Sequence, residues 1–373
     1  MRIAVVGAGI NGIMSALALA EAGHAVVLFE RGRAMDATSS ASSKLLHGGL
    51  RYLETGDIAL VCEGLRERAW WLQTAPQFAR RIEMVVPVLR DSPRGRWMLK
   101  LGLLTYDLLA GRRRLGWHRW IRANDLRARN PGLRADDLLG GYLYFDGAMD
   151  DRALGMWALE RALALRVELR EGTGVETVDV EGGIVAGGRR EDFDYAVNAA
   201  GPWAQRLLER SGVTSRHRLD LVRGSHLVAR RRIGQGFLLQ SPDDARVCFV
   251  LPYGEHCLIG TTEVPQTLDE PISCSDDERA YLMRLFDRHF SPALRADDIV
   301  DTFAGLRPLV AGSVNHVSRI SRDYAVERNG RLVTVFGGKW TTARALGLRV
   351  VAELAAGQGG GRDPGAARNP LTI

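Results

Sequence analysis

A strand, a glycine-rich turn and a helix open this chain, and this combination restricts the fold more than any other segment. Residues 2–6 are mostly apolar and run directly into Gly7-Ala8-Gly9-Ile10-Asn11-Gly12, after which a helix-forming stretch begins. Gly7 allows a tight turn, Gly9 lets a pyrophosphate approach the backbone, and Gly12 lets helix and strand pack closely. Unpaired amides at the helix N-terminus favour phosphate. The sequence therefore predicts a Rossmann-like dinucleotide-binding domain.

An acidic residue ends the second predicted strand. Residues 25–29 are an apolar segment, and Glu30 follows it directly. A carboxylate at this place can accept hydrogen bonds from both hydroxyls of an adenosine ribose, and it would repel a 2′-phosphate. We therefore predict a bound dinucleotide without that phosphate.

The segment of residues 39–54 adds a more specific chemistry. It reads Ser-Ser-Ala-Ser-Ser-Lys-Leu-Leu-His-Gly-Gly-Leu-Arg-Tyr-Leu-Glu. Small residues allow close approach to a flat ring, and the hydroxyl and cationic groups suit a polar, anionic ligand. This segment favours a buried flavin next to an anionic substrate.

Composition is that of a globular enzyme. A length of 373 residues allows roughly two domains, and 46% of the residues are hydrophobic, which is ordinary for a globular core. The four cysteines show no C-x-x-C spacing, and the eight histidines show no metal-like spacing, so we expect a reducing compartment and no metal site. No stretch is long and uncharged enough to predict a transmembrane helix. We therefore expect a cytoplasmic protein, with a peripheral position on the cytoplasmic face of the inner membrane as the alternative.

The net charge of +6 is concentrated in one region, residues 94–122. Its arginines and Lys100 lie among tryptophans and leucines, a mixture typical of a membrane surface. An amphipathic helix packed on its own domain, with solvated arginines, explains the same pattern. Nucleic-acid binding is disfavoured because no helix-turn-helix, RNA-binding sheet or zinc-finger motif is present.

Periodicity predicts an α/β fold with a second, α+β part. Helices are expected at 57–78, 150–164, 275–290 and 341–356, and residues 92–133 look helical. Four or so strands within 219–269, without helices between them, predict an antiparallel substrate-binding sheet. We assign residues 1–80, 146–216 and 330–357 to a discontinuous nucleotide-binding domain, 81–145 and 217–329 to a substrate-binding domain, and 358–373 to a flexible tail.

Eight motifs in order resemble those of the FAD-dependent, quinone-linked sn-glycerol-3-phosphate dehydrogenases of the amino-acid-oxidase-like flavoprotein superfamily. They are residues 7–12, 39–54, 198–203 (Asn-Ala-Ala-Gly-Pro-Trp), 224–226 (Gly-Ser-His), 259–263 (Ile-Gly-Thr-Thr-Glu), 305–309 (Gly-Leu-Arg-Pro-Leu), 322–324 (Arg-Asp-Tyr) and 336–342 (Phe-Gly-Gly-Lys-Trp-Thr-Thr). The resemblance runs almost from end to end. It implies FAD as cofactor, hydride transfer from C2 of glycerol 3-phosphate to flavin N5, and a quinone or similar electron acceptor.

The resemblance also implies a set of site residues. Substrate contacts are expected from Arg51, Tyr52, His226, Arg307, Arg322 and Lys339. Cofactor contacts are expected from Gly7, Gly9, Ile10, Asn11, Gly12, Glu30, Ser39, Ser40, Ser42, Ser43, Lys44, Leu46, His47, Gly48, Gly49, Val175, Ala200, Gly201, Trp203, Gly305, Gly338, Lys339, Trp340 and Thr341.

Residue chemistry divides the substrate set further. Arginine forks and a lysine suit a phosphate, so we assign Arg51, Arg322 and Lys339 to it. Arg307 and His226 are placed near the hydroxyl that is oxidised, as the catalytic pair. His226 is the preferred proton acceptor and His47 the competitor, because an arginine stays protonated and stabilises an alkoxide instead.

The chain also departs from the family. Bacterial members usually continue into a C-terminal helical domain, which we expect this chain to lack, so its oligomeric state stays open. Trp340 stands where a smaller aliphatic residue is common, and a reshaped pocket could accept another substrate. A flavin-dependent oxidase or dehydrogenase of a hydroxy acid, amine or other phosphorylated polyol is one alternative, and a non-catalytic flavoprotein is another.

Overall fold

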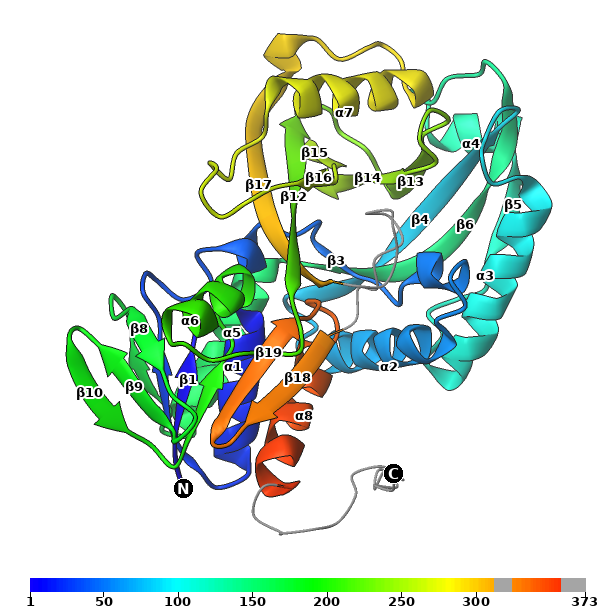
Figure 1. Cartoon of the computed structure of the whole chain (residues 1–373). Coiled ribbons are helices and arrows are strands. Elements are labelled where there is room, and N and C mark those ends of the chain that lie inside the picture. The colour runs from blue at the N-terminus through cyan, green and yellow to red at the C-terminus, as the bar shows by residue number, and fades with distance from the viewer. Residues whose placement is uncertain (312–323, 357–373) are drawn as a thin grey trace.

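The computed structural model describes residues 1–311 and 324–356. One of its two large sheets has six strands (Figure 1). The strand order is β18-β19-β11-β1-β2-β7. All neighbours are parallel except β18, which pairs antiparallel with β19. The strands are β1 (Arg2–Val6), β2 (Ala25–Phe29), β7 (Glu168–Arg170), β11 (Tyr195–Asn198), β18 (Tyr324–Asn329) and β19 (Leu332–Gly337).

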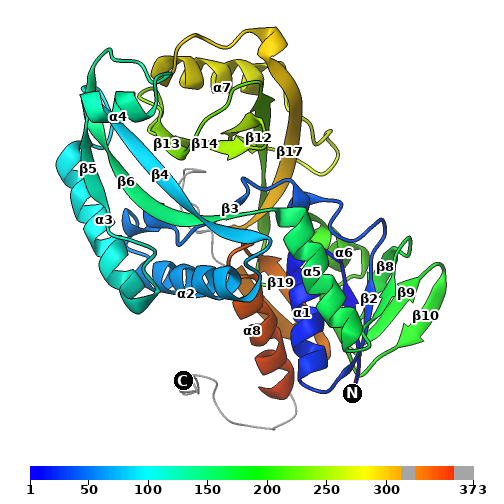
Figure 2. The ribbon, with the colours of Figure 1, turned by 180° about the vertical axis from the view of Figure 1, so that it is seen from behind.

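Both faces of this sheet are covered, as the alternation of side chains in β1 requires. Ile3 and Val5 pack against the helices α1 (Ile10–Glu21), α5 (Asp151–Ala164) and α8 (Ala343–Ala356). Ala4 and Val6 face the opposite layer, made by the meander β8 (Val175–Val178), β9 (Gly183–Ala186) and β10 (Arg189–Asp192) with α6 (Ala204–Arg210). Figure 2 shows the helical layer from behind. The predicted Rossmann-like arrangement is therefore confirmed.

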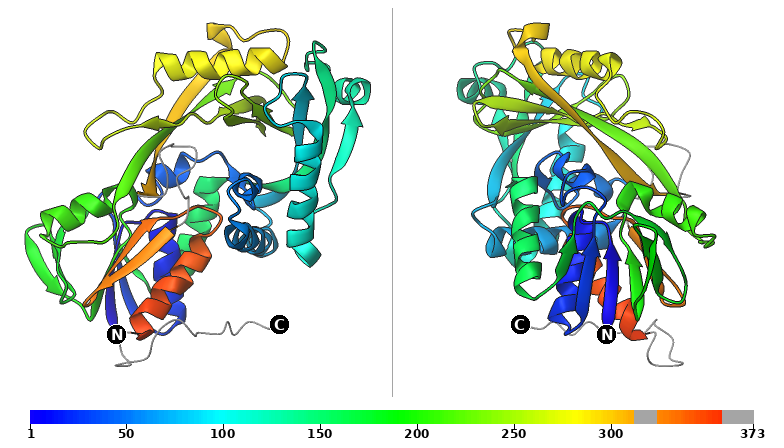
Figure 3. Two further views of the ribbon diagram at one scale, coloured as in Figure 1. Left: turned by 45° about the vertical axis from the view of Figure 1, so that its right-hand side comes forward. Right: turned by 90° about the vertical axis from the view of Figure 1, so that its left-hand side faces the viewer.

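The second sheet has ten strands and is mostly antiparallel. Its order is β16-β12-β15-β14-β13-β4-β6-β3, with β17 paired to β12 and β5 to β6. The strands are β3 (Leu45–Leu46), β4 (Ala79–Leu89), β5 (Arg119–Arg122), β6 (Leu138–Met149), β12 (Leu219–Ala229), β13 (Gly236–Gln240), β14 (Val247–Tyr253), β15 (His256–Gly260), β16 (Val264–Pro265) and β17 (Ile299–Val310). Figure 3 shows the long strands β12 and β17 reaching from the upper part of the molecule towards the first sheet.

Four helices pack around the second sheet. They are α2 (Ile58–Thr74), α3 (Arg96–Ala110), α4 (Ala123–Arg129) and α7 (Asp276–His289). Phe286 of α7 belongs to the core on one face, and Leu103 of α3 belongs to the core on the other. Short 3-10 turns lie at Thr38–Ser40, Leu50–Leu53, Gly111–Arg113, Gly201–Trp203 and Ala296–Asp298.

Two sequence predictions about elements need correction. Residues 92–133 are not helical throughout, because Gly111 and Gly116 adopt positive φ after α3 and the following residues form β5, which pairs with β6. The helix predicted at 57–78 is α2, which ends at Thr74, before the predicted end, and β4 begins at Ala79.

The domain assignment stays a prediction, and some strands cross its boundaries. β18 lies in the six-stranded sheet although residues 217–329 were assigned to the substrate-binding part. β3 lies in the ten-stranded sheet although residues 1–80 were assigned to the nucleotide-binding part. The predicted tail, 358–373, lies outside the described residues. Within the described residues, none of the helices is long and apolar enough to cross a membrane.

Candidate active site

A cavity of about 580 Å³ lies where the two sheets meet. Its walls come from the turn after β1, the segment after β2, the turns after β11 and β19, and parts of β12 and β17. The carboxyl ends of parallel strands are the usual ligand site of a doubly wound sheet. Most of the predicted site residues line this cavity, namely Gly7, Gly9, Ile10, Asn11, Glu30, Ser39, Ser42, Ser43, His47, Tyr52, Val175, Ala200, Gly201, Trp203, His226, Gly305, Arg307, Gly338, Lys339, Trp340 and Thr341.

The glycine turn brings α1 close to the neighbouring strands. Gly7 has φ +100, and a Cβ there would lie 2.7 Å from the carbonyl oxygen of Ala199. A Cβ on Gly12 would lie 1.8 Å from the carbonyl oxygen of Gly7. Gly12 does not itself line the cavity, so its part is to allow the close packing that leaves room for a ligand.

Glu30 is held at one end of the cavity by backbone amides. Its Oε2 accepts a hydrogen bond from the amide of Ala8 at 2.8 Å, and its Oε1 accepts one from Gly32 at 2.9 Å. Next to it, the Arg31 guanidinium lies 3.8 Å from the ring centroid of Trp203. Arg31 also lines the cavity and was not predicted, because a stacking pair between distant segments leaves no local sequence signal.

The serine-rich segment is fixed mainly by contacts with other elements. Ser39 Oγ accepts from the amide of Ile10 at 3.0 Å, and the Ser39 carbonyl accepts from Trp340 Nε1 at 2.8 Å. Ser42 Oγ and Lys44 Nζ both donate to the carboxylate of Asp151, each at 2.6 Å. Asp151 sits in the first turn of α5 and was not predicted, although an acidic residue there fits a helix N-terminus.

Six further predicted residues lie outside the cavity lining. Ser40 Oγ donates to the Met35 carbonyl, Lys44 is paired with Asp151, and Leu46 is buried in the core. The amide of Gly48 donates to Tyr106 Oη at 2.8 Å, and a Cβ on Gly49 would lie 2.2 Å from the Tyr52 ring. Arg51 Nη1 lies 3.8 Å from Glu263 Oε1. Their direct contact with a cofactor or substrate remains a prediction.

His226 is the most perturbed titratable group of the site. Its Nε2 lies 2.9 Å from Ser43 Oγ, and its ring stacks on Phe303 with centroids 4.8 Å apart. Nδ1 is buried and has no hydrogen-bond partner among the residues that the structure describes. Burial, with smaller contributions from Arg307 and Lys44, lowers the pKa of His226 to about 3. The imidazole is therefore neutral at physiological pH.

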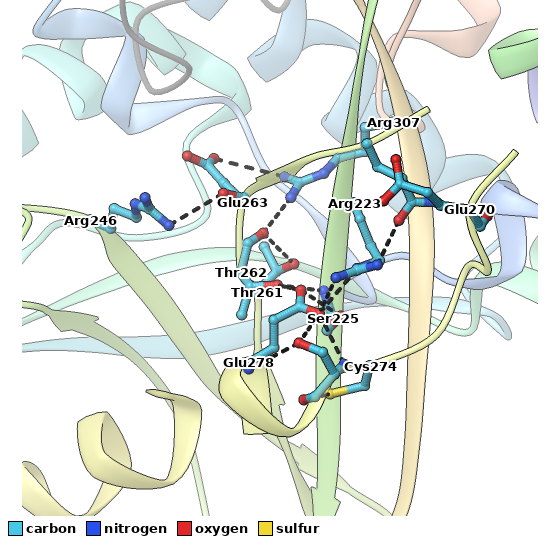
Figure 4. A network of polar contacts seen from close by, with 12 residues as sticks. Arg223, Ser225, Arg246, Thr261, Thr262, Glu263, Glu270, Cys274, Glu278 and Arg307 are labelled. Atoms are coloured by element: carbon cyan, nitrogen blue, oxygen red, sulfur yellow. Dashed lines mark hydrogen bonds and ion pairs between the residues drawn. The ribbon is translucent and has the colours of Figure 1, made fainter. Parts of the chain in front are cut away.

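Arg307 projects from β17 towards β12 and the loop after β15. Its Nη2 donates to the Thr262 carbonyl at 2.6 Å, and its Nη1 lies 3.9 Å from Glu263 Oε1 (Figure 4). Glu263, which also faces Arg51, was not singled out in the sequence because its role depends on two arginines from distant elements. Lys339, another lining residue, has its Nζ 3.9 Å from the Tyr52 ring centroid. Arg322 lies outside the described residues.

The residues present fit a flavin adenine dinucleotide. The turn of Gly7, Gly9 and Gly12, here called the glycine cradle, has no room for side chains at Gly7 or Gly12, because a Cβ there would clash with backbone carbonyl oxygens. A carboxylate, Glu30, stands at the end of β2. Asn11 Oδ1 is buried at the cavity without a hydrogen-bond partner among the described residues, as expected for an atom that awaits a ligand. No group of side chains within 1–311 and 324–356 has the arrangement of a metal site.

Fold and cavity together define a protein with a dinucleotide-binding sheet and a second, mostly antiparallel sheet that meets it at the cavity. The chain belongs to the family of FAD-dependent oxidoreductases, whose model matches residues 2–354. FAD is its cofactor, as the sequence predicted.

Individual relatives and solved structures show which proteins this chain is similar to. The chain is 34% identical to a glycerol-3-phosphate dehydrogenase of Pseudomonas tolaasii over 95% of its own length and 71% of the relative's. It is also 34% identical to a D-erythritol 1-phosphate dehydrogenase of Brucella abortus, over 92% of this chain and 72% of that protein. The solved glycerol-3-phosphate dehydrogenase of Bacillus halodurans with FAD superimposes with a TM-score of 0.76 at 24% identity, covering 96% of this chain and 65% of that one. The family resemblance and the mixed α/β fold predicted from the sequence are thus confirmed.

Proposed function

We propose that this chain oxidises sn-glycerol 3-phosphate at C2 to dihydroxyacetone phosphate and passes the electrons to a quinone or a similar acceptor. The observation that carries the proposal is the meeting of His226, Arg307, Tyr52 and Lys339 at the same cavity as the glycine cradle. FAD, when bound, supplies the hydride acceptor at flavin N5. The relatives named as dehydrogenases of phosphorylated polyols support this substrate class.

The cofactor would be held along the length of the cavity. Glu30 would accept from the adenosine ribose, and the amides at the N-terminus of α1 would face the pyrophosphate. Trp340 would hold the serine-rich segment against the flavin, because its indole donates to the Ser39 carbonyl. Lys339 and Gly338 follow β19 and would approach the ring from the same turn.

The cationic side chains account for an anionic substrate. Glycerol 3-phosphate carries nearly two negative charges, so its phosphate needs more than one cation nearby. Lys339 and Arg307 line the cavity. Arg51 lies outside the lining, but it faces Glu263, the same carboxylate that Arg307 faces. We assign the phosphate to Lys339, Arg51 and Arg322, and the hydroxyl end to Arg307.

His226 would receive the hydroxyl proton while C2 loses its hydride. The Ser43 hydroxyl at 2.9 Å offers a route for this proton to Nε2. Because burial lowers the pKa of His226 to about 3, the ring accepts the proton only as the hydride leaves. The fixed charge of Arg307 would stabilise the developing alkoxide. Fixed positions of both groups before the substrate arrives would favour electrostatic catalysis.

Substitution of Arg307 tests the proposal. Arg307→Ala should lower kcat/KM for sn-glycerol 3-phosphate by about 100-fold or more, because a cation next to the reacting oxygen is lost. FAD content should match the unmodified protein. Steady-state turnover with an artificial acceptor measures this, with D-erythritol 1-phosphate as a second substrate. Unchanged turnover of Arg307→Ala would contradict the assignment of Arg307 to the active site. A higher kcat/KM with D-erythritol 1-phosphate than with sn-glycerol 3-phosphate would contradict the proposed substrate.

The exposed face of α3 supports a second element of the proposal, a peripheral position on an anionic membrane. Trp97 is 71% exposed, Leu101 67% and Leu108 61%, and they follow helical spacing on one face. Arg96 and Lys100 lie on the same helix, and Arg112–Arg114 follow it. A basic helix with a bare aromatic and aliphatic face is suited to a membrane interface.

Vesicle binding tests this position. The protein should sediment with vesicles that contain phosphatidylglycerol and less with neutral phosphatidylcholine vesicles. The double variant Trp97→Gln/Leu101→Gln should lose sedimentation, whereas Leu165→Gln, which removes an exposed leucine after α5, should not. Equal sedimentation of all three proteins would contradict the assignment.

A separate experiment identifies the electron acceptor. The rate at which the reduced flavin is reoxidised by a soluble quinone is compared with the rate of its reoxidation by oxygen.

A further inference from the structure

A buried carboxylate on α7 organises the strand and the loop that carry the hydroxyl end of the site. Glu278 lies in the first turn of α7 and is 5% exposed. Its Oε1 accepts from Ser225 Oγ at 2.8 Å and from Thr262 Oγ1 at 2.5 Å. Its Oε2 accepts from Arg223 Nη2 at 2.8 Å (Figure 4). The same oxygen accepts from the Ser275 amide at 3.0 Å. One side chain therefore joins three separate segments of the chain.

The donors around Glu278 all point at the carboxylate. The single proton of the Thr262 hydroxyl goes to Glu278, so the hydroxyl oxygen is free to accept from the Ser225 amide at 2.9 Å. Burial acts to raise the pKa of Glu278, but the hydrogen bonds from Thr262, Ser275, Ser225 and Arg223 outweigh it, so the pKa lies below its ordinary value. The network thus needs an ionised acceptor at this position.

One residue connects Glu278 to each member of the catalytic pair: Ser225 to His226, and Thr262 to Arg307. Ser225 precedes His226 on β12, so the side chain and amide of Ser225 fix the backbone next to the imidazole. Thr262 presents its carbonyl to Arg307 Nη2 at 2.6 Å while its hydroxyl is bound to Glu278. Glu278 does not line the cavity, and it therefore acts through these residues.

We propose that Glu278 is a positioning residue that sets the places of Arg307 and His226 for the reaction. The inference rests on the proposed function, because those two residues were assigned to the hydroxyl end there. The residues that act on the reaction would then include one from α7, a helix that packs on the second sheet and contributes no residue to the cavity lining.

Isosteric variants separate positioning from folding. Glu278→Gln keeps the shape but brings an NH2 group to face either the two hydroxyls or the Arg223 and Ser275 donors. Thr262→Val removes the hydroxyl at constant shape, and Thr262→Ser keeps it. Glu327→Gln is the matched control, because Glu327 is also buried and accepts from Ser215 Oγ and the Arg216 amide, away from the cavity.

The test uses the full chain loaded with FAD. Glu278→Gln and Thr262→Val should lower kcat/KM by about 10- to 100-fold, mainly through kcat, as expected for a misplaced catalytic group. Thr262→Ser and Glu327→Gln should stay within about threefold of the unmodified protein, and all four variants should retain FAD. Titration calorimetry with inorganic phosphate adds a readout independent of turnover. The free anion, unlike the phosphate of the substrate, can reach Arg307 as well as Lys339, because both line the same cavity, so Glu278→Gln should bind it more weakly when Arg307 is displaced.

The outcomes distinguish this inference from the proposed function. Wild-type kinetics and phosphate affinity in both Glu278→Gln and Thr262→Val would overturn the inference. Equal losses in Thr262→Ser and Thr262→Val would also overturn it, since the hydroxyl would not be the cause. If the unmodified protein fails to oxidise sn-glycerol 3-phosphate, the proposed function falls, and the phosphate titration alone decides on Glu278. If Glu278→Gln does not fold, the Thr262 pair gives the answer.

Discussion

One methyl group at Gly224 should disable the site without disturbing the fold. Gly224 lies on β12, opposite Gly305 of β17, and its φ is not in the left-handed region. A Cβ there would lie 2.4 Å from Arg307 Nη2 and 2.5 Å from Thr261 Oγ1. Carbon and nitrogen atoms in contact are normally about 3.5 Å apart, so the guanidinium must move by about 1 Å.

The expected loss follows from that displacement. Arg307 Nη2 now donates to the Thr262 carbonyl at 2.6 Å, and a shift of this size takes it beyond ordinary hydrogen-bond range. A charged hydrogen bond contributes about 1.5–3 kcal/mol, and misplacing a reacting group by about 1 Å lowers the rate by up to about 100-fold. Gly224→Ala should therefore reduce kcat/KM by about 10- to 100-fold. The end of an arginine is flexible, so the melting temperature should change little.

Steady-state kinetics and thermal unfolding of the FAD-loaded protein measure the two effects. Gly234→Ala is the matched control, because a Cβ at that exposed glycine meets nothing within 4 Å. An unchanged kcat/KM in Gly224→Ala would refute the reasoning, since the position of Arg307 would then not matter. A large fall in melting temperature would show that the strand, and not the arginine, absorbs the added group.

Two further predictions concern the cofactor and the buried histidine. Glu30→Ala should bind FAD about 10-fold or more weakly, because two hydrogen bonds to a carboxylate that orders the turn are lost; titration of the apoprotein with FAD measures this, and an unchanged affinity would contradict it. The pKa of His226 is lowered from 6.5 to about 3 in the folded state by burial, Arg307 and Lys44, so the stability that its neutral form provides is present above about pH 6.5 and is lost as the pH falls towards 3. Between pH 6.5 and 3 the free energy of unfolding should therefore fall more steeply with decreasing pH than in His226→Asn, by up to about 1.4 kcal/mol per pH unit. Denaturant titrations at several pH values measure this. Parallel plots of the free energy of unfolding against pH for the two proteins would count against a buried neutral histidine.

The sequence was sufficient to predict those parts of the site that are encoded locally. Gly7, Gly9 and Glu30 belong to one strand–turn–helix–strand unit, in which each position has its own physical requirement. The part of the second sheet formed by β12 to β16 was also predictable, because these strands follow one another along the chain without helices between them.

Contacts between distant segments could not be predicted in the same way. Asp151 binds Ser42 and Lys44 from the start of α5, and Glu278 reaches Thr262 and Ser225 from the start of α7. Nothing near these acids in the sequence marks their partners. Lys44 is an example, since nothing near it in the sequence shows that its ammonium group donates to Asp151 and to the Ser40 carbonyl. Its contact with the cofactor stays a prediction.

Anaerobic reduction of the flavin tests the central claim most directly. The purified FAD-loaded protein is mixed with sn-glycerol 3-phosphate in the absence of oxygen while the absorption band of the oxidised flavin is followed. Rapid bleaching by this substrate, and its loss in Arg307→Ala with the flavin still bound, is the result that the account predicts. A flavin that stays oxidised with sn-glycerol 3-phosphate but is still reduced by dithionite would contradict it.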